Sequence, residues 1–127
     1  MPKFLCNATY SSGSWARMIR ISEDRVKAVN DLLSSLGGTL ESTYWEVSAR
    51  AVYALIDMPD SASATAVAAV MTHTGAFKSV EMHEVLSQRQ FNEVLELADS
   101  VAETYTPPGQ ALLDGDSPHL RLGLRGH

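Results

Sequence analysis

Cysteine is nearly absent from this chain of 127 residues, and its one cysteine, Cys6, has no partner for an internal disulfide. Cys6 lies in the apolar run KFLCNATY, and no histidine or lysine stands next to it in the sequence to favour a reactive thiolate. Free cysteine is among the residue types most often buried in folded proteins. We therefore expect Cys6 to be a buried, unreactive thiol.

Basic residues and long apolar runs are also scarce. Ten basic residues against fifteen acidic ones give a formal charge of -5, whereas a nucleic-acid-binding domain usually carries a basic face. No apolar stretch approaches the ~20 residues of a membrane span. The first residues, Met1 to Phe4, lead straight into a strand-like segment and lack the pattern of a signal peptide. We expect a cytoplasmic protein that binds neither nucleic acid nor membrane.

Cofactor and metal motifs are missing as well. The sequence has no phosphate-binding loop, nucleotide fingerprint, haem motif or G-x-S-x-G elbow. The segment EMHE at 81–84 comes nearest to a metal motif, but in a strand Glu81 and His83 point to one side and Glu84 to the other. We therefore expect neither a cofactor nor a metal.

What the sequence does contain is a regular succession of strand and helix patterns. Alternating apolar residues predict strands at 3–10, 39–47, 51–57 and 77–86. A short helical turn is predicted at 15–21, and a helix follows that is capped by Ser22 and ended by Gly37-Gly38. Further helices are predicted at 61–73, capped by Asp60 or Ser61, and after a Ser87–Gln90 capping box as far as Val101.

This order of elements predicts an α+β fold, the ferredoxin-like βαββαβ protomer followed by a C-terminal helix. Right-handed crossovers place both helices on one face of the antiparallel sheet. The strands are apolar at both parities, as in Phe4-Leu5-Cys6, so the other face also needs a cover, and a second copy of the chain is the simplest one. We expect a homodimer of a domain spanning 1–109, with 110–127 as a flexible C-terminal tail.

The opening MPKFLCNATYSSG, the helix end SLGGTLES, the strand exit VYALIDMPD and the closing TPPG resemble segments of GYD-domain proteins. The resemblance spans residues 1–109 and implies a protomer of the dimeric α+β barrel superfamily. Related dimeric barrels include cofactor-free oxygenases of aromatic polyketides, lactone isomerases, polyketide cyclases and haem-binding enzymes.

The glycine, tyrosine and aspartate that name the family would align with Ser48, Arg50 and Ala51, so the signature itself is not retained. A turn without its glycine must avoid positive φ or accept strain of order 1 kcal/mol. Arg50 is a candidate to supply a cation to an anionic ligand. The alternative is a solvated arginine at a hairpin bend.

In a protomer of this type the natural cavity lies between the helices and the sheet, and the alanine-rich helix at 61–73 leaves room there. Tyr44 and Trp45 are neighbours in a strand, so they point to opposite faces and only one can line a given cavity. Asn7 interrupts the apolar first strand and either binds a substrate carbonyl or phenol or bonds to neighbouring backbone. For the aromatic residues the alternative is packing in the core or at an interface. The candidate ligand-binding residues are Asn7, Trp15, Tyr44, Trp45, Arg50 and His73.

The candidate catalytic residues are His83, Glu81 and Tyr53. His83 and Glu81 lie two residues apart in a strand and therefore share a face. A carboxylate beside an imidazole orients it and raises its basicity, which suits proton abstraction from a carbon acid. Cross-strand solvation explains the pair equally well. His73, at the end of the helix at 61–73, is instead a candidate for ligand binding, because the helix dipole favours an imidazolium there.

Three hypotheses follow. The first is a small cofactor-independent oxygenase, cyclase or isomerase acting on an aromatic or polyketide-like molecule, with Trp15, Asn7, Tyr53 and His83 in its pocket lining. The second is a ligand-binding or stress-related module without chemistry, and the third is a purely structural dimer. A pocket of roughly 300 Å³ or more with a histidine or tyrosine hydroxyl in its lining would favour the first.

Overall fold

The computed structural model describes residues 1–109, which divide into two compact units. The first unit is Met1–Leu86, and the second begins at Ser87. The expectation of one domain over 1–109 stays a prediction. The tail expected at 110–127 lies outside the described residues.

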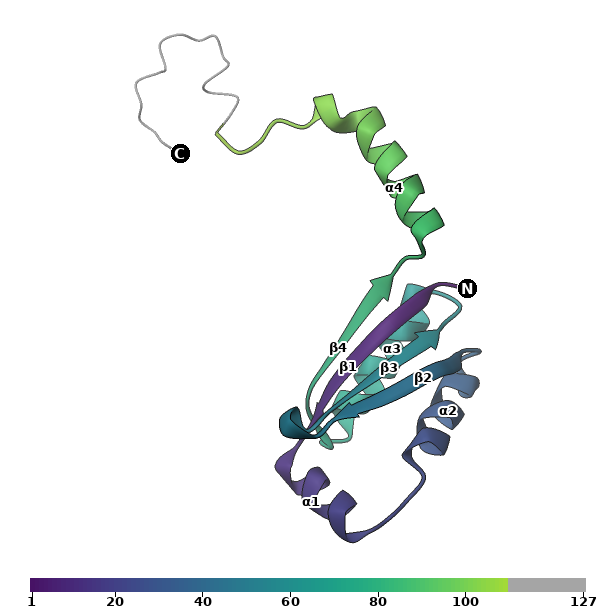
Figure 1. Cartoon of the computed structure of the whole chain (residues 1–127), viewed down its shortest axis with the longest axis vertical. Helices are drawn as coiled ribbons and strands as arrows, with labels where there is room; N and C mark the ends of the chain where they lie inside the picture. The colour runs from purple at the N-terminus through teal and green to yellow at the C-terminus, as the bar shows by residue number, and fades with distance from the viewer. Residues whose placement is uncertain (110–127) are drawn as a thin grey trace. The chain divides into compact units, whose positions relative to one another are not determined.

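The first unit is built on a four-stranded antiparallel sheet in the order β2-β3-β1-β4 (Figure 1). The central strands are β1 (Lys3–Tyr10) and β3 (Ala51–Asp57), and the edge strands are β2 (Thr39–Glu46) and β4 (Phe77–Val85). In the register of the sheet, Cys6 lies opposite Ala54 of β3 and Met82 of β4. The predicted ferredoxin-like α+β fold is therefore confirmed, with each strand boundary within one residue of its predicted position.

Helices α2 (Arg25–Ser35) and α3 (Ser61–His73) form the two crossovers and cover the same face of the sheet (Figure 1). This helix-covered face carries the even-numbered residues of β1 and their cross-strand partners. Leu33 of α2 and Val67 of α3 are almost completely buried against it. The core of the unit consists of Phe4, Cys6, Leu33, Ala54, Ile56, Met58, Ala64 and Val67.

The start of the helical region differs from the prediction. Helix α1 (Ser12–Arg20) is a nine-residue helix, longer than the turn expected at 15–21. Its N-cap is Ser11, whose hydroxyl accepts a hydrogen bond from the Ser14 N–H at 3.2 Å. Helix α2 is capped by Asp24 and not by Ser22, because the Asp24 carboxylate accepts from the Lys27 N–H at 2.9 Å. Serine is common both where a strand ends and at the N-cap of a helix. The sequence prediction took Ser11 only as the end of the strand and so placed the helix start too late.

The two glycines at the end of α2 act as predicted. Gly37 adopts a left-handed φ of 80°, and the Gly38 N–H donates to the Leu33 carbonyl at 2.8 Å. This hydrogen bond satisfies a carbonyl of the last helical turn, as in a Schellman motif. Gly38 also lies against Met58 so closely that an added Cβ would stand 2.3 Å from the sulfur. The sequence Gly37-Gly38 therefore sets both the end of α2 and its approach to the end of β3.

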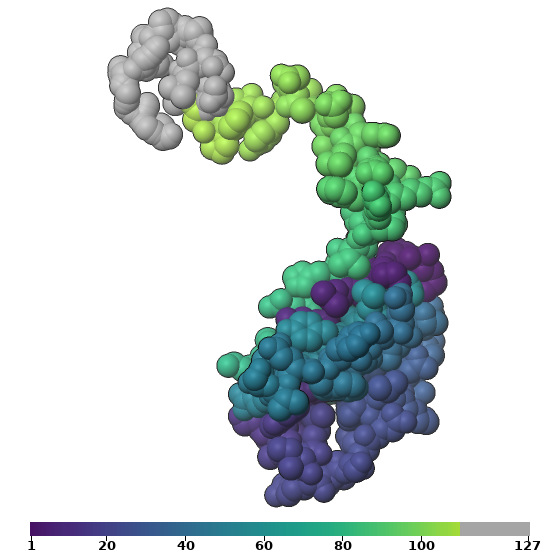
Figure 2. Space-filling view, in the orientation of Figure 1, coloured from purple at the N-terminus to yellow at the C-terminus, as the bar shows by residue number. Residues whose placement is uncertain are grey.

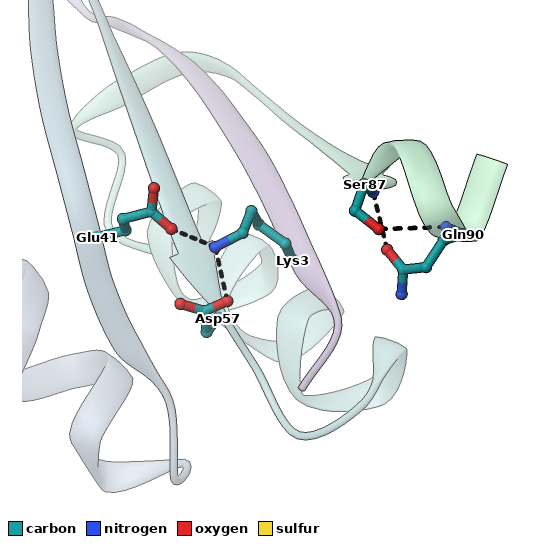
Figure 3. A network of polar contacts seen from close by, with 5 residues as sticks. All are labelled: Lys3, Glu41, Asp57, Ser87 and Gln90. Atoms are coloured by element: carbon teal, nitrogen blue, oxygen red, sulfur yellow. Dashed lines mark hydrogen bonds and ion pairs between the residues drawn. The ribbon is translucent and has the colours of Figure 1, made fainter. Parts of the chain in front are cut away.

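The face of the sheet away from α2 and α3, called the open face below, carries the odd-numbered residues of β1 and β3 and their partners on β4. Leu5 and Leu55 lie opposite one another at its centre and are half-buried. At one end Lys3 donates to the carboxylates of Glu41 and Asp57 (Figure 3). These two hydrogen bonds, of which the one to Glu41 has the larger effect, raise the pKa of Lys3 above its usual value. The open face is thus apolar at its centre and polar around it.

The second unit contains α4 (Gln88–Val101), followed by a short 3-10 turn at Ala102–Thr104. The predicted capping box is confirmed: the Ser87 hydroxyl accepts from the Gln90 N–H at 3.2 Å, and the Gln90 side chain accepts from the Ser87 N–H at 2.9 Å (Figure 3). Each residue thereby satisfies a backbone donor that the helix leaves free.

Candidate functional site

The sheet divides the predicted site residues between its two faces. Trp15 and Trp45 lie on the helix-covered side, where Trp15 packs on Tyr10 and Trp45, 41% exposed, donates a hydrogen bond to Tyr10. The open face carries Asn7, Tyr44, Tyr53, Glu81 and His83. Tyr44 and Trp45 therefore point to opposite faces, as predicted. The expectation that Trp15, Asn7, Tyr53 and His83 line one pocket is wrong, because the sheet stands between them.

An aromatic cluster forms on the helix-covered side at the end of β1. Tyr10 is buried and lies 5.8 Å from the Trp15 ring and 5.0 Å from the Phe77 ring, centroid to centroid. The Trp45 indole N–H donates to the Tyr10 hydroxyl at 3.4 Å. Because an indole only donates, the Tyr10 oxygen is the acceptor and its own proton stays available to another group.

A concavity of about 250 Å³ opens beside this cluster, between α1 and the start of α2. We call it the mouth, and Figure 2 shows the surface hollowed between these helices. Its lining combines Tyr10, Ser14 and apolar side chains with two arginines and one glutamate. The lining residues are Tyr10, Ser14, Arg17, Met18, Ile21, Glu23, Arg25 and Ala76.

A narrower cavity, called the slot, continues from Tyr10 and Arg25 between the sheet and helices α2 and α3. Its volume is only about 30 Å³, since Leu33, Ile56 and Val67 fill most of this space. The slot is almost wholly apolar. Thr43 is one of its few polar residues: the hydroxyl oxygen is buried and has no hydrogen-bond partner among the described residues. A buried polar atom without a partner is costly, so Thr43 is a candidate to bind a polar group of a ligand.

Cys6 also borders the slot but is not a nucleophile. Burial raises the pKa of its thiol to about 11, so the thiolate is rare near neutral pH. The prediction of a buried thiol at Cys6 is confirmed.

On the open face, the side chains of His83 and Glu81 are hydrogen-bonded at 3.1 Å, as their spacing predicts. Both side chains are more than half exposed. Asn7 lies opposite Glu81 in the sheet, and its Oδ1 atom is buried without a hydrogen-bond partner among the described residues. These three residues thus form a polar group at the surface of the sheet, outside any concavity described above.

Tyr53, the third predicted catalytic residue, lies opposite Asn7 on the same face. Its hydroxyl donates to the Glu46 carboxylate at 2.8 Å, and this hydrogen bond raises the pKa of Tyr53 above its usual value. A tyrosine with a raised pKa stays neutral near pH 7. Tyr53 therefore acts as a hydrogen-bond donor in this structure.

Arg50 is the only non-glycine residue with a positive φ among residues 1–109, with φ 52° and ψ 41°. Its guanidinium donates to the Ser12 hydroxyl at 2.8 Å, and its carbonyl accepts from the Tyr10 N–H at 2.8 Å. The left-handed backbone therefore lies at Arg50, and Ser48, the position aligned with the signature glycine, has no positive φ. Arg50 ties the bend to the junction of β1 and α1 and does not line the mouth.

The remaining predicted ligand-binding residue, His73, is exposed at the end of α3 and lines neither the mouth nor the slot. Sequence reasoning missed Tyr10, Arg17 and Thr43. The position of Thr43 could have been predicted, because it lies two residues before Trp45 on β2 and its side chain therefore points to the same face. Tyr10 and Arg17 gave no such signal, since their proximity depends on how α1 folds back beside the strand end.

A metal site is not apparent in the described part of the chain. Residues 1–109 contain no group of three or more histidine, cysteine, aspartate or glutamate side chains placed to hold a metal ion. Among the helices of the same residues, none has both the length and the apolar character that a bilayer crossing requires.

The protein is thus an α+β domain of the ferredoxin-like class, with its concave surface between the helices and the sheet. The GYD domain family matches residues 4–95, most of the described chain, and the protein belongs to this family. No curated protein matches the sequence.

Proposed function

We propose that this GYD-domain protein binds a small aromatic or largely apolar molecule on the helix-covered side of its sheet, in the mouth and against the slot. The observation that carries the proposal is the Tyr10–Trp45 hydrogen bond at the point where the two cavities adjoin. Ligand sites typically combine an apolar wall with a few well-placed polar groups. The Tyr10 hydroxyl and the buried Thr43 oxygen are such groups.

The mouth holds about 250 Å³, slightly below the roughly 300 Å³ at the lower end of small-molecule sites. Its lining includes a tyrosine hydroxyl but no histidine. This combination supports binding more directly than catalysis.

A neutral fluorescent aromatic probe, N-phenyl-1-naphthylamine, tests the proposal. Trp15 and Trp45 are the only tryptophans of the chain and both lie on the helix-covered side, so a probe bound there should quench their emission. Ala76→Phe should fill the mouth and abolish the quenching. Ala69→Phe, on the exposed side of α3, is the matched control and should retain it. Quenching that Ala76→Phe leaves intact would count against this location.

Cofactor-independent catalysis on an aromatic or polyketide-like molecule is the second candidate, and the 3.1 Å His83–Glu81 hydrogen bond favours it. His83, with Glu81 and Tyr53, would act as catalytic group on the open face, and Asn7 would bind the substrate. Because this face is exposed in a single chain, such a site would need a second protomer to exclude water. Incubating candidate aromatic metabolites with the wild type, His83→Ala and Tyr53→Phe tests it. Equal binding without turnover in all three would remove catalysis.

A homodimer paired through the open face is part of the same proposal. Its support is the half-buried apolar centre at Leu5 and Leu55. Sedimentation should give about twice the 13.8 kDa chain mass, and Leu55→Glu should give the monomer. Thr65→Glu, at an exposed position of α3, should leave the dimer intact. A wild-type monomer in dilute solution would contradict this pairing.

A further inference from the structure

The mouth keeps one positive charge without a carboxylate partner. Its two arginines differ in this respect: the Arg25 guanidinium pairs with Glu23 at 2.9 Å, also within the lining. The Arg17 guanidinium makes a single, long contact of 3.4 Å with the neutral Ser14 hydroxyl. Among residues 1–109, no carboxylate lies within ion-pair distance of Arg17. In a protein of net charge -5, a free cation at a concave site favours an anionic group of the ligand.

Two residues with hydroxyl groups, Ser14 and Tyr10, line the mouth together with Arg17. Ser14 is buried, 7% exposed, and its hydroxyl lines the mouth. The Tyr10 hydroxyl accepts from Trp45, which leaves its proton free to donate. A guanidinium and two hydroxyls around one concavity form a set of donors that a carboxylate or sulfonate accepts.

Part of the wall around these donors is apolar. Met18 and Ile21 of the α1 region line the mouth, and the rings of Trp15 and Phe77 pack against Tyr10. A wholly polar anion such as free phosphate would leave this apolar surface without contact. A ligand with an aromatic body and one acidic group matches both parts of the site.

We infer that the ligand is an aromatic or apolar acid whose anionic group pairs with Arg17 and accepts hydrogen bonds from Tyr10 and Ser14, while its ring system lies against the aromatic cluster. This inference rests on the proposed function and specifies its ligand. It assigns the charge recognition to Arg17 and not to Arg50, whose guanidinium bonds to Ser12.

Two probes that share one aromatic skeleton test the inference on the full chain. 8-Anilino-1-naphthalenesulfonate carries an anionic group, and N-phenyl-1-naphthylamine has the same rings without it. The Arg17→Gln variant should weaken binding of the sulfonate about fivefold or more, as expected for loss of one charge-assisted hydrogen bond. It should leave the affinity for the neutral probe within about twofold. Raising the salt concentration should weaken only the sulfonate complex of the wild type.

Arg20→Gln is the matched control, because Arg20 is on the same helix and does not line the mouth. It should change neither affinity. If the wild type and Arg17→Gln bind the sulfonate equally well, or if both arginine variants weaken it equally, the assignment of the anion to Arg17 is overturned while the ligand site stands. If the wild type binds neither probe, the proposed function itself is overturned.

Discussion

The indole of Trp45 and the hydroxyl of Tyr10, 35 residues apart in the chain, are joined by a hydrogen bond of 3.4 Å on the helix-covered side of the sheet. The bond links edge strand β2 to the end of β1, across the intervening strand β3. It fixes the direction of the Tyr10 hydroxyl, whose proton can then point to a ligand. The candidate site depends on this orientation more than on any other single contact.

Replacing Tyr10 by phenylalanine removes the acceptor for Trp45 and keeps the ring that packs on Trp15 and Phe77. We expect a loss of about 1 kcal/mol in the free energy of unfolding, as is typical for one hydrogen bond. Urea denaturation measures it. Tyr44→Phe is the control, since Tyr44 is 70% exposed, and its stability should match the wild type. Equal losses in the two variants would mean that the Tyr10 hydroxyl has no structural partner.

The left-handed conformation of Arg50 predicts an order of stability between two variants. Arg50→Gly and Arg50→Ala both lose the hydrogen bond to Ser12, so their difference reports on the backbone alone. A residue with a Cβ pays about 1 kcal/mol in this region, whereas glycine does not. Thermal or urea unfolding should therefore show Arg50→Gly to be the more stable of the two by about that amount. An alanine variant of equal or greater stability would show that the bend relaxes out of positive φ.

Gly38 and Gly13 should respond to alanine with opposite signs. A Cβ at Gly38 would stand 2.3 Å from the Met58 sulfur and 2.7 Å from the Asp57 carbonyl oxygen, so packing must shift. We expect Gly38→Ala to cost about 1–3 kcal/mol, the usual cost of overpacking. At Gly13, within α1, the nearest atom is the Arg17 side chain at 3.7 Å, and Gly13→Ala should gain about 0.5 kcal/mol in helix propensity. Chemical denaturation of both variants gives the two signs.

The buried thiol predicts a pH dependence. Burial raises the pKa of Cys6 from its ordinary 9.0 to about 11 in the folded protein. The neutral thiol is therefore favoured by folding, so this contribution to stability is fully present below pH 9 and is lost as the pH rises through 11. Between pH 9 and 11, the wild type should lose stability relative to Cys6→Ala.

Thiol reactivity gives an independent check. At pH 8 the native protein should react with a disulfide reagent far more slowly than the protein unfolded in urea, because about one native molecule in a thousand carries the thiolate. Equal rates in the two states would contradict the burial of Cys6.

The sequence was sufficient for the fold because each element repeats its pattern over many residues. The strand Ala51–Asp57 and the helix Ser61–His73 lie where alternation and helical spacing predict them. Helix α1 was harder, because Ser11-Ser12-Gly13-Ser14 is as typical of a loop as of a helix start. The hydrogen bonds from the Ser14 N–H to the Ser11 hydroxyl and from the Trp15 N–H to the Ser11 carbonyl distinguish the two.

The site was less predictable than the fold. Because side chains alternate along a strand, the sequence predicts which residues share a face, such as Glu81 and His83. It does not predict whether α2 and α3 cover that face or the opposite one, and so leaves open where Asn7 and Tyr53 lie. The strands are apolar at both parities, so hydrophobicity alone left the choice open. In the structure, α2 and α3 cover the face of the sheet that carries Cys6 and Ala54. Trp45 lies on that side, whereas His83 and Glu81 lie on the open face.

The central claim is that a ligand binds on the helix-covered side of the sheet, and a nuclear magnetic resonance titration with N-phenyl-1-naphthylamine tests it most directly. The indole N–H signals of Trp15 and Trp45 report on this side, and the ring signals of His83 and Tyr53 report on the open face. Our account predicts that both indole signals shift with a common saturation curve while the His83 and Tyr53 signals stay in place. Shifts confined to His83 and Tyr53, with both indoles unchanged, would contradict it.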